Sequence, residues 1–100
     1  MIKILRSIRI RGGKVAEATQ HAKAVASYVN QRFAPTNVQV FVEVFGNAGT
    51  LYWIADVESV AALENLDNQL NAGPEFQGLL AEGFSLFVEG SFHDTLLRSV

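Results

Sequence analysis

Residues 2–33, IKILRSIRIRGGKVAEATQHAKAVASYVNQRF, decide the fold class because the spacing of their apolar side chains changes at a pair of glycines. Before the glycines, four isoleucines occupy even positions, and this period of two predicts a β-strand. After Gly12-Gly13, apolar residues recur every three or four positions from Lys14 to Phe33, which predicts an amphipathic helix. Pro35 is typical of a helix end. The chain therefore begins with a strand and a helix.

The rest of the chain continues this alternation of strands and helices. Its predicted elements are a strand from Val38 to Phe45, a hairpin loop at Gly46–Gly49, a strand from Leu51 to Val57, a helix from Glu58 to Leu70 with Asp56 as a possible N-cap, a short helix from Pro74 ended by Gly83, and a strand from Phe84 to Phe92. The order β-α-β-β-α-β predicts a ferredoxin-like α+β domain, with a four-stranded antiparallel sheet and its helices on one face.

Length and composition limit the functional classes. One hundred residues fit a single domain, residues 1–100, and a 49% apolar content with 18% charged residues is typical of a globular protein. No cysteine is present, so disulfides and thiol chemistry are excluded, and the two histidines do not have metal-ligand spacing. We expect no metal, no cofactor, no nucleic acid and no membrane partner, and a cytoplasmic location.

Charge is unevenly distributed along the chain despite a net value of −2. Five of the eight basic residues occur in the first fourteen positions: Lys3, Arg6, Arg9, Arg11 and Lys14. A basic strand in an otherwise acidic chain indicates internal charge pairing, and an anion site is the alternative.

The two faces of the predicted sheet differ in what they could contact. A four-residue hairpin loop would place Phe45 opposite Thr50 and the valines of the second strand under the helices. The other face would carry large apolar groups that are unfavourable in water. We therefore expect a homodimer through this open face, with the interface residues Phe41, Glu43, Phe45, Tyr52 and Phe87.

Arg6 interrupts the isoleucine face of the first strand, and the predicted register places no acid on that face. A buried unpaired guanidinium is costly. Three interpretations remain open: the side chain reaches solvent or is turned out by a bulge, it pairs with a helix acid such as Glu17, or it meets an anionic or carbonyl ligand in a pocket between helices and sheet.

Three further side chains could border such a pocket. His21 and Tyr28 share one flank of the first helix, and Trp53 points inward from the third strand. A solvated helix edge for His21 and Tyr28, and an ordinary core position for Trp53, are the alternatives.

The layout resembles the dimeric α/β-barrel superfamily, which includes antibiotic-biosynthesis-monooxygenase-like and NIPSNAP-like proteins. Two segments strengthen the resemblance: Leu51–Val57 running into the second helix, and Gly73–Leu80, GPEFQGLL, which is similar to the family's D-P-E-[YF]-Q-x-L-L helix with Gly73 in place of Asp. The resemblance implies a homodimer whose sheets form a barrel, with a cleft between helices and sheet in each subunit. Arg6 stands on the strand where the oxygenase pattern has an asparagine.

Two functional hypotheses follow from this resemblance and these residues. The first is a cofactor-independent, monooxygenase-like enzyme acting on a small aromatic or carbonyl-bearing molecule in the cleft. Arg6 would stabilise negative charge, His21 would be the general acid or base, and Trp53 and Tyr28 would stack on the substrate. The second is a non-catalytic dimeric module that binds a small ligand or provides an oligomerisation surface.

Overall fold

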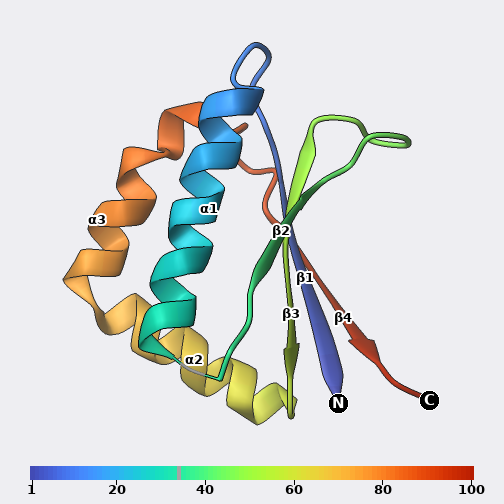
Figure 1. Ribbon diagram of the computed structural model, residues 1–100, viewed down its shortest axis with the longest axis vertical. Helices are drawn as coiled ribbons and strands as arrows, with labels where there is room; N and C mark the ends of the chain where they lie inside the picture. Colours follow the sequence, from blue (N-terminus) through green and yellow to red (C-terminus); the bar gives the residue numbers. More distant parts are fainter. Residues whose placement is uncertain (34) are drawn as a thin grey trace.

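The computed structural model describes residues 1–33 and 35–100 and has strands and helices in the order shown in Figure 1. The elements are β1 (Ile2–Arg9), α1 (Val15–Arg32), β2 (Gln39–Val42), β3 (Thr50–Val57), α2 (Val60–Ala72), α3 (Pro74–Glu82), the short 3-10 helix η1 (Phe84–Leu86) and β4 (His93–Arg98).

The four strands form one antiparallel sheet in the order β2-β3-β1-β4, and the helices lie on one face of it (Figure 1). The predicted ferredoxin-like α+β fold is therefore confirmed. β1 lies inside the sheet, paired with β3 on one side and β4 on the other. Its even-numbered residues face the helices, so Ile2 and Ile4 are buried while Lys3 is exposed.

The β2–β3 hairpin is paired differently from the prediction. Val42 lies opposite Leu51, whereas a four-residue loop would place it opposite Trp53. Glu43 takes part in the turn: its carboxylate accepts a hydrogen bond from the Asn47 N–H at 2.6 Å. The predicted register is therefore wrong by two positions. A shift of two residues leaves each side chain on its original face, so the assignment of faces for β2 and β3 remains valid.

The last strand is the main error of the sequence-based prediction. Residues 84–92 do not form a strand that pairs along β1: they contain η1 and a single bridge between Ile10 and Phe87, and β4 begins only at His93. Phe87 is buried in the core, where it contacts the helix side and not the open face. Its expected place at the dimer interface is therefore wrong.

Helix boundaries are close to the predicted ones, with one different cap. α2 begins at Val60, and its N-cap is Ser59, whose hydroxyl accepts a hydrogen bond from the Ala62 N–H at 3.1 Å. Such a cap satisfies one of the free N–H groups of the first turn. Asp56, the predicted cap, instead forms an ion pair with Lys3 at 3.0 Å.

The hydrophobic core lies between the sheet and the helices in three clusters. One joins α1 to Leu51 and Phe87, a second joins α1 to α2 and α3 around Phe76, and a third joins Ile4 to α2 through Leu63. Trp53 packs against the first two clusters from β3.

Candidate functional site

A cavity of about 400 Å³ lies between the helix layer and the sheet. Side chains from β1, β3 and all three α-helices line it, and most are apolar. The lining residues are Ile4, Arg6, Val25, Ala26, Val29, Thr36, Val38, Trp53, Ala55, Val57, Leu63, Leu66, Asp67, Leu70, Asn71, Phe76, Leu80 and Phe92. The predicted pocket between helices and sheet is therefore present in the structure.

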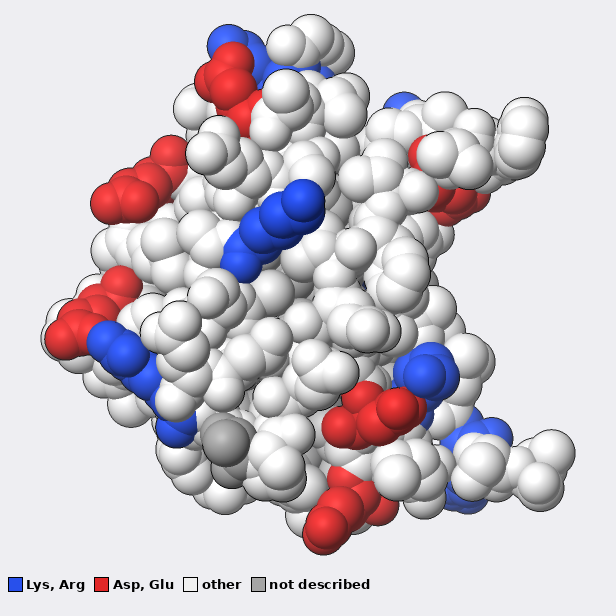
Figure 2. Space-filling model, viewed as in Figure 1, with Lys and Arg blue, Asp and Glu red and all other residues white. Residues whose placement is uncertain are grey.

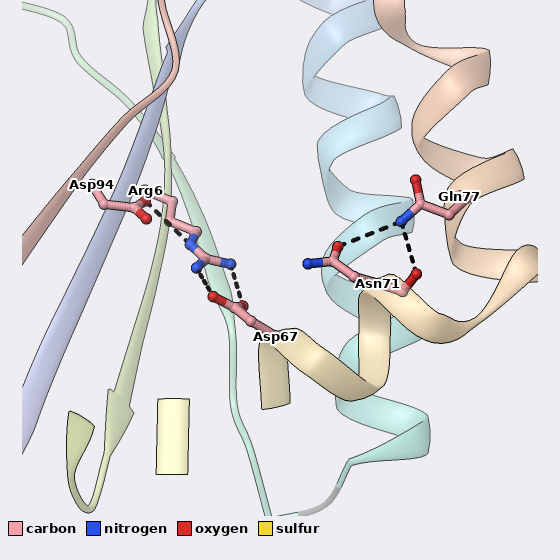
Figure 3. Close-up of polar contacts among 5 residues, drawn as sticks. All are labelled: Arg6, Asp67, Asn71, Gln77 and Asp94. Carbon is pink, nitrogen blue, oxygen red and sulfur yellow. Dashed lines mark hydrogen bonds and ion pairs between the residues drawn. The ribbon is translucent and has the colours of Figure 1, made fainter. Parts of the chain in front are cut away.

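Arg6 is held at the edge of this cavity between two carboxylates (Figure 3). Both terminal nitrogens of its guanidinium donate to Asp67 of α2, with an Nη1–Oδ1 distance of 2.7 Å. Its Nε donates to Oδ1 of Asp94 on β4 at 3.1 Å. Of the three interpretations, pairing with a helix acid is correct, but the acid is Asp67. Glu17 instead pairs with Lys14, the residue that precedes α1.

The expectation that no acid shares the sheet face of Arg6 is wrong, because the last strand is formed by residues 93–98 and not by the predicted residues 84–92. Asp94 lies directly opposite Arg6 in the β1–β4 register. Burial lowers the pKa of Arg6, but the hydrogen bonds and charges of Asp67 and Asp94 outweigh it, so the net shift is upward. Arg6 is therefore permanently charged and firmly held.

Trp53 lines the cavity, as predicted for a substrate-binding residue, and its one polar atom already has a partner. The indole Nε1–H donates to the carbonyl oxygen of Ala22 at 3.0 Å, and the ring lies 6.3 Å from that of Phe87. The indole is thereby tied to α1. Trp53 offers a ligand an apolar surface.

Tyr28 and His21 lie elsewhere. The Tyr28 ring is 5.6 Å from that of Phe76 and carries the Arg32 guanidinium over its face at 4.2 Å, so it joins α1 to α3. Neither Tyr28 nor His21 is among the described residues that line the cavity. The structure thus does not place His21 in the cavity that Arg6 and Trp53 line.

His21 is part of the packing at the end of α3. Its ring lies 6.1 Å from that of Phe87, and a side chain at Gly83 would collide with it. Burial lowers the pKa of His21, while the negative charge of Glu82 opposes this to a smaller extent. This environment is that of a neutral, packed histidine.

Sequence reasoning missed two polar residues that line the cavity, Asp67 and Asn71, and a third, Asp94, that binds Arg6 at its edge. Asn71 is oriented by Gln77, whose Nε2 lies 3.4 Å from both the Asn71 carbonyl and Oδ1. Figure 3 shows the amide nitrogen of Asn71 pointing towards Arg6 and Asp67. One signal was available for Asp67: it falls within the inward stripe of Leu63, Leu66 and Leu70.

The open face of the sheet carries aromatic side chains on β2 and β3. Phe41 lies opposite Tyr52, and the Tyr52 hydroxyl donates to Glu43 at 2.6 Å. Phe41 is 48% exposed and Phe45, at the hairpin tip, is 89% exposed. Figure 2 shows this side as an indentation between the hairpin and the last residues of the chain. The structure places Phe41, Glu43 and Tyr52 on this face, as predicted.

The described residues offer neither a metal site nor a membrane-spanning helix. Residues 1–33 and 35–100 contain no group of three histidine or acidic side chains arranged to hold a metal ion. In that part of the chain, no helix has the length and apolar character needed to span a bilayer.

Comparison with known proteins identifies the fold. Neither a protein-family model nor a curated protein matches the sequence. Among solved structures, a NIPSNAP domain protein from Burkholderia xenovorans is 15% identical, with a TM-score of 0.83 over 100% of this chain and 95% of its own. A NIPSNAP family protein of unknown function from Agrobacterium tumefaciens is 14% identical, with a TM-score of 0.83 over 100% and 88%.

An antibiotic biosynthesis monooxygenase is also similar, with 17% identity and a TM-score of 0.70 over 100% of this chain and 99% of its own. Identities this low establish the fold and not the activity. The resemblance predicted from the sequence is confirmed at that level: the chain has the ferredoxin-like fold shared by NIPSNAP-domain and antibiotic biosynthesis monooxygenase proteins.

Proposed function

We propose that this protein binds a small, predominantly apolar molecule in the cavity between helices and sheet, as a homodimer. The observation that carries the proposal is the cavity of about 400 Å³, whose apolar wall is interrupted by polar groups at one edge. Small-molecule sites have this composition: a mainly hydrophobic lining with a few placed polar groups, in a volume of roughly 300–1,000 Å³. A volume near the lower limit favours a ligand of one or two rings.

Binding is better supported than catalysis by the residues present. Arg6 is already paired with two carboxylates, so it is poorly placed to stabilise a developing anion. His21 packs on Phe87 and Tyr28 packs on Phe76, and neither is itself part of the cavity lining, so neither is placed to act on a ligand there as general acid or base. Of the three aromatic residues predicted to border the pocket, Trp53 is the one that lines the cavity.

A monooxygenase-like enzyme is the second candidate. It is favoured by the fold shared with an antibiotic biosynthesis monooxygenase and by the Trp53 ring on the cavity wall. In that case the cavity would hold an aromatic or carbonyl-bearing substrate, and Trp53 would pack against it.

Trp53 is the only tryptophan, so its fluorescence reports directly on the cavity. We expect saturable quenching or a spectral shift on titration with a naphthalene-sized apolar probe. Val57→Phe places a larger side chain in the cavity and should weaken the fluorescence response to the probe. Val15→Phe, at the exposed start of α1, should leave that response unchanged. No response from the folded protein to any apolar probe would refute the proposal.

The homodimer is proposed from the exposed apolar groups on the open face. Phe41→Asp places a charge among the apolar side chains of this face and should convert the dimer into monomers in light scattering coupled to size exclusion. Phe84→Asp is the matched control, because Phe84 is 70% exposed on η1, outside the sheet. A dimer that survives Phe41→Asp, or a wild-type protein that is monomeric at all concentrations tested, would contradict the proposal.

A further inference from the structure

Charge balance at the polar edge of the cavity indicates which head group a ligand would carry. Arg6 contributes one positive charge, and Asp67 and Asp94 contribute one negative charge each. Both carboxylates accept hydrogen bonds from the same guanidinium, so a ligand experiences the sum of the three charges, which is −1. This reverses the expectation from the sequence, in which Arg6 was a candidate for meeting an anion.

From this arrangement we infer that the ligand is an apolar molecule with a cationic amine or another hydrogen-bond donor at its polar end, and not a carboxylate or phosphate. The inference rests on the proposed function, because it specifies the ligand class of the same cavity. It applies to the edge of the cavity that Arg6 and Asp67 line, where Asp94 adds its charge through its ion pair with Arg6. The apolar part of the lining does not discriminate between charged head groups.

Arg6 is not free to turn towards an anion. A guanidinium has five N–H donors, and three of those on Arg6 are used, one on Asp94 and two on Asp67. An incoming carboxylate would have to displace one of these carboxylates or approach both at close range. Either alternative costs electrostatic free energy in a partly desolvated site.

The carboxylates, in contrast, retain acceptor capacity. An ionised carboxylate has about four lone-pair positions, and Asp67 uses two of them on Arg6. Asp67 lines the cavity itself, and its side chain is 29% exposed, so its remaining lone pairs are accessible to a donor. An ammonium group has donors only and satisfies both the geometry and the charge.

The other basic residues of β1 and β4 and the neutral polar groups do not change this balance. Lys3 points to the opposite face of the sheet and pairs with Asp56. Arg98, opposite Ile2 on the helix-facing side of β4, is not among the described residues that line the cavity. Asn71 and Thr36 are the neutral polar side chains of the lining, and they suit a charged or an uncharged head group equally. Discrimination between head groups therefore depends on Arg6, Asp67 and Asp94.

Three probes with one apolar body test the inference: 2-naphthylmethylamine, 2-naphthalenemethanol and 2-naphthoic acid, each titrated at pH 7 by calorimetry. Expected affinities fall in that order, with the amine bound about tenfold more tightly than the acid, as partly exposed charges allow. If the alcohol binds and the acid binds as tightly as the amine or more tightly, the inference fails while the proposed function stands. If none of the three binds, both fail.

The variant Asp94→Asn tests whether the preference for the amine over the acid depends on the charges of Arg6, Asp67 and Asp94. The substitution raises the local charge from −1 to 0, so the ratio of amine to acid affinity should fall about threefold. Glu89→Gln removes the same charge from an exposed position in the turn before β4 and should leave the ratio unchanged. A ratio that is unaltered in Asp94→Asn, or that falls equally in both variants, would overturn the assignment.

Discussion

Replacing Arg6 with leucine should destabilise the protein, although it removes a charge from the face of the sheet that packs on the helices. The substitution leaves Asp67 and Asp94 facing one another across the position that the guanidinium occupied. Two carboxylates that had shared one cation then repel each other and lose three hydrogen bonds. α2 also loses this polar attachment to the sheet.

The magnitude follows from the exposure of the three groups. Breaking a fully buried pair by removing one partner costs about 3–5 kcal/mol. Here the side chains of Arg6 and Asp67 are 26% and 29% exposed, and that of Asp94 is 40% exposed, so water moderates the loss. We expect a decrease of about 2 kcal/mol in the free energy of unfolding, which in a domain of this size lowers the Tm by roughly 10 °C.

Urea denaturation of a double-mutant cycle measures the effect. Arg6→Leu and Asp67→Leu should each destabilise, and the double variant should be more stable than the sum of the single changes predicts, because replacing both members of an ion pair by apolar groups is often neutral. Lys14→Met, which removes the exposed 3.7 Å pair with Glu17, should change the free energy by less than about 0.5 kcal/mol.

Two results would refute this reasoning. If Arg6→Leu equals or exceeds the wild type in stability, the guanidinium is a structural cost and its two ion pairs contribute nothing. If the two single changes are strictly additive, Arg6 and Asp67 do not interact in solution.

Three further predictions concern the packing around His21 and Phe87. Burial lowers the pKa of His21 in the folded protein below the ordinary 6.5, so just below that pH the unfolded chain binds more protons than the folded one. The free energy of unfolding should therefore fall as the pH decreases below 6.5. The dependence of Tm on pH should be weaker in His21→Gln. An equal slope in both proteins would exclude His21 as the cause. Gly83→Ala should lower the Tm because its Cβ collides with the His21 ring, and the added change His21→Ala should recover part of the loss; no recovery would show that the strain lies elsewhere. Phe87→Ala should cost about 3–5 kcal/mol in urea denaturation, whereas Phe45→Ala at the 89% exposed hairpin tip should cost little in a monomeric background; similar losses would contradict the buried position of Phe87.

The periodicity of apolar residues in the sequence predicts most of the strands and helices that the structure contains. α1 and β3 lie within one residue of their predicted ends and β1 within two, because a buried face imposes a clear period of two or of three to four on the sequence. β4 has no such face: each of its residues is exposed, and Leu96 and Leu97 are adjacent, so no alternation marks it. The apparent alternation of residues 84–92 instead belongs to η1 and the segment that follows it.

The candidate site could be predicted only where it depends on a single element. The helix–sheet location and the inward side chain of Trp53 follow from local pattern, and both are present. The partners of Arg6 depend on the rotation of α2 about its axis and on the register of β4, which are set by packing between distant parts of the chain. Because the last strand was predicted at residues 84–92, Asp94 was not expected beside Arg6 and Phe87 was expected on the open face of the sheet.

The position of β1 between β3 and β4 has a consequence for the order of folding. Ile2 pairs with Arg98, so the β1–β4 ladder closes a loop that contains nearly the whole described chain, whereas the β2–β3 hairpin closes only a short one. Closure entropy grows with loop length, and topologies rich in such distant contacts fold slowly. The hairpin and helices should thus form first and β4 should dock late. Until it docks, one backbone edge of β1 stays available to a strand from another molecule, so an interrupted folding reaction is where this protein is most prone to aggregate.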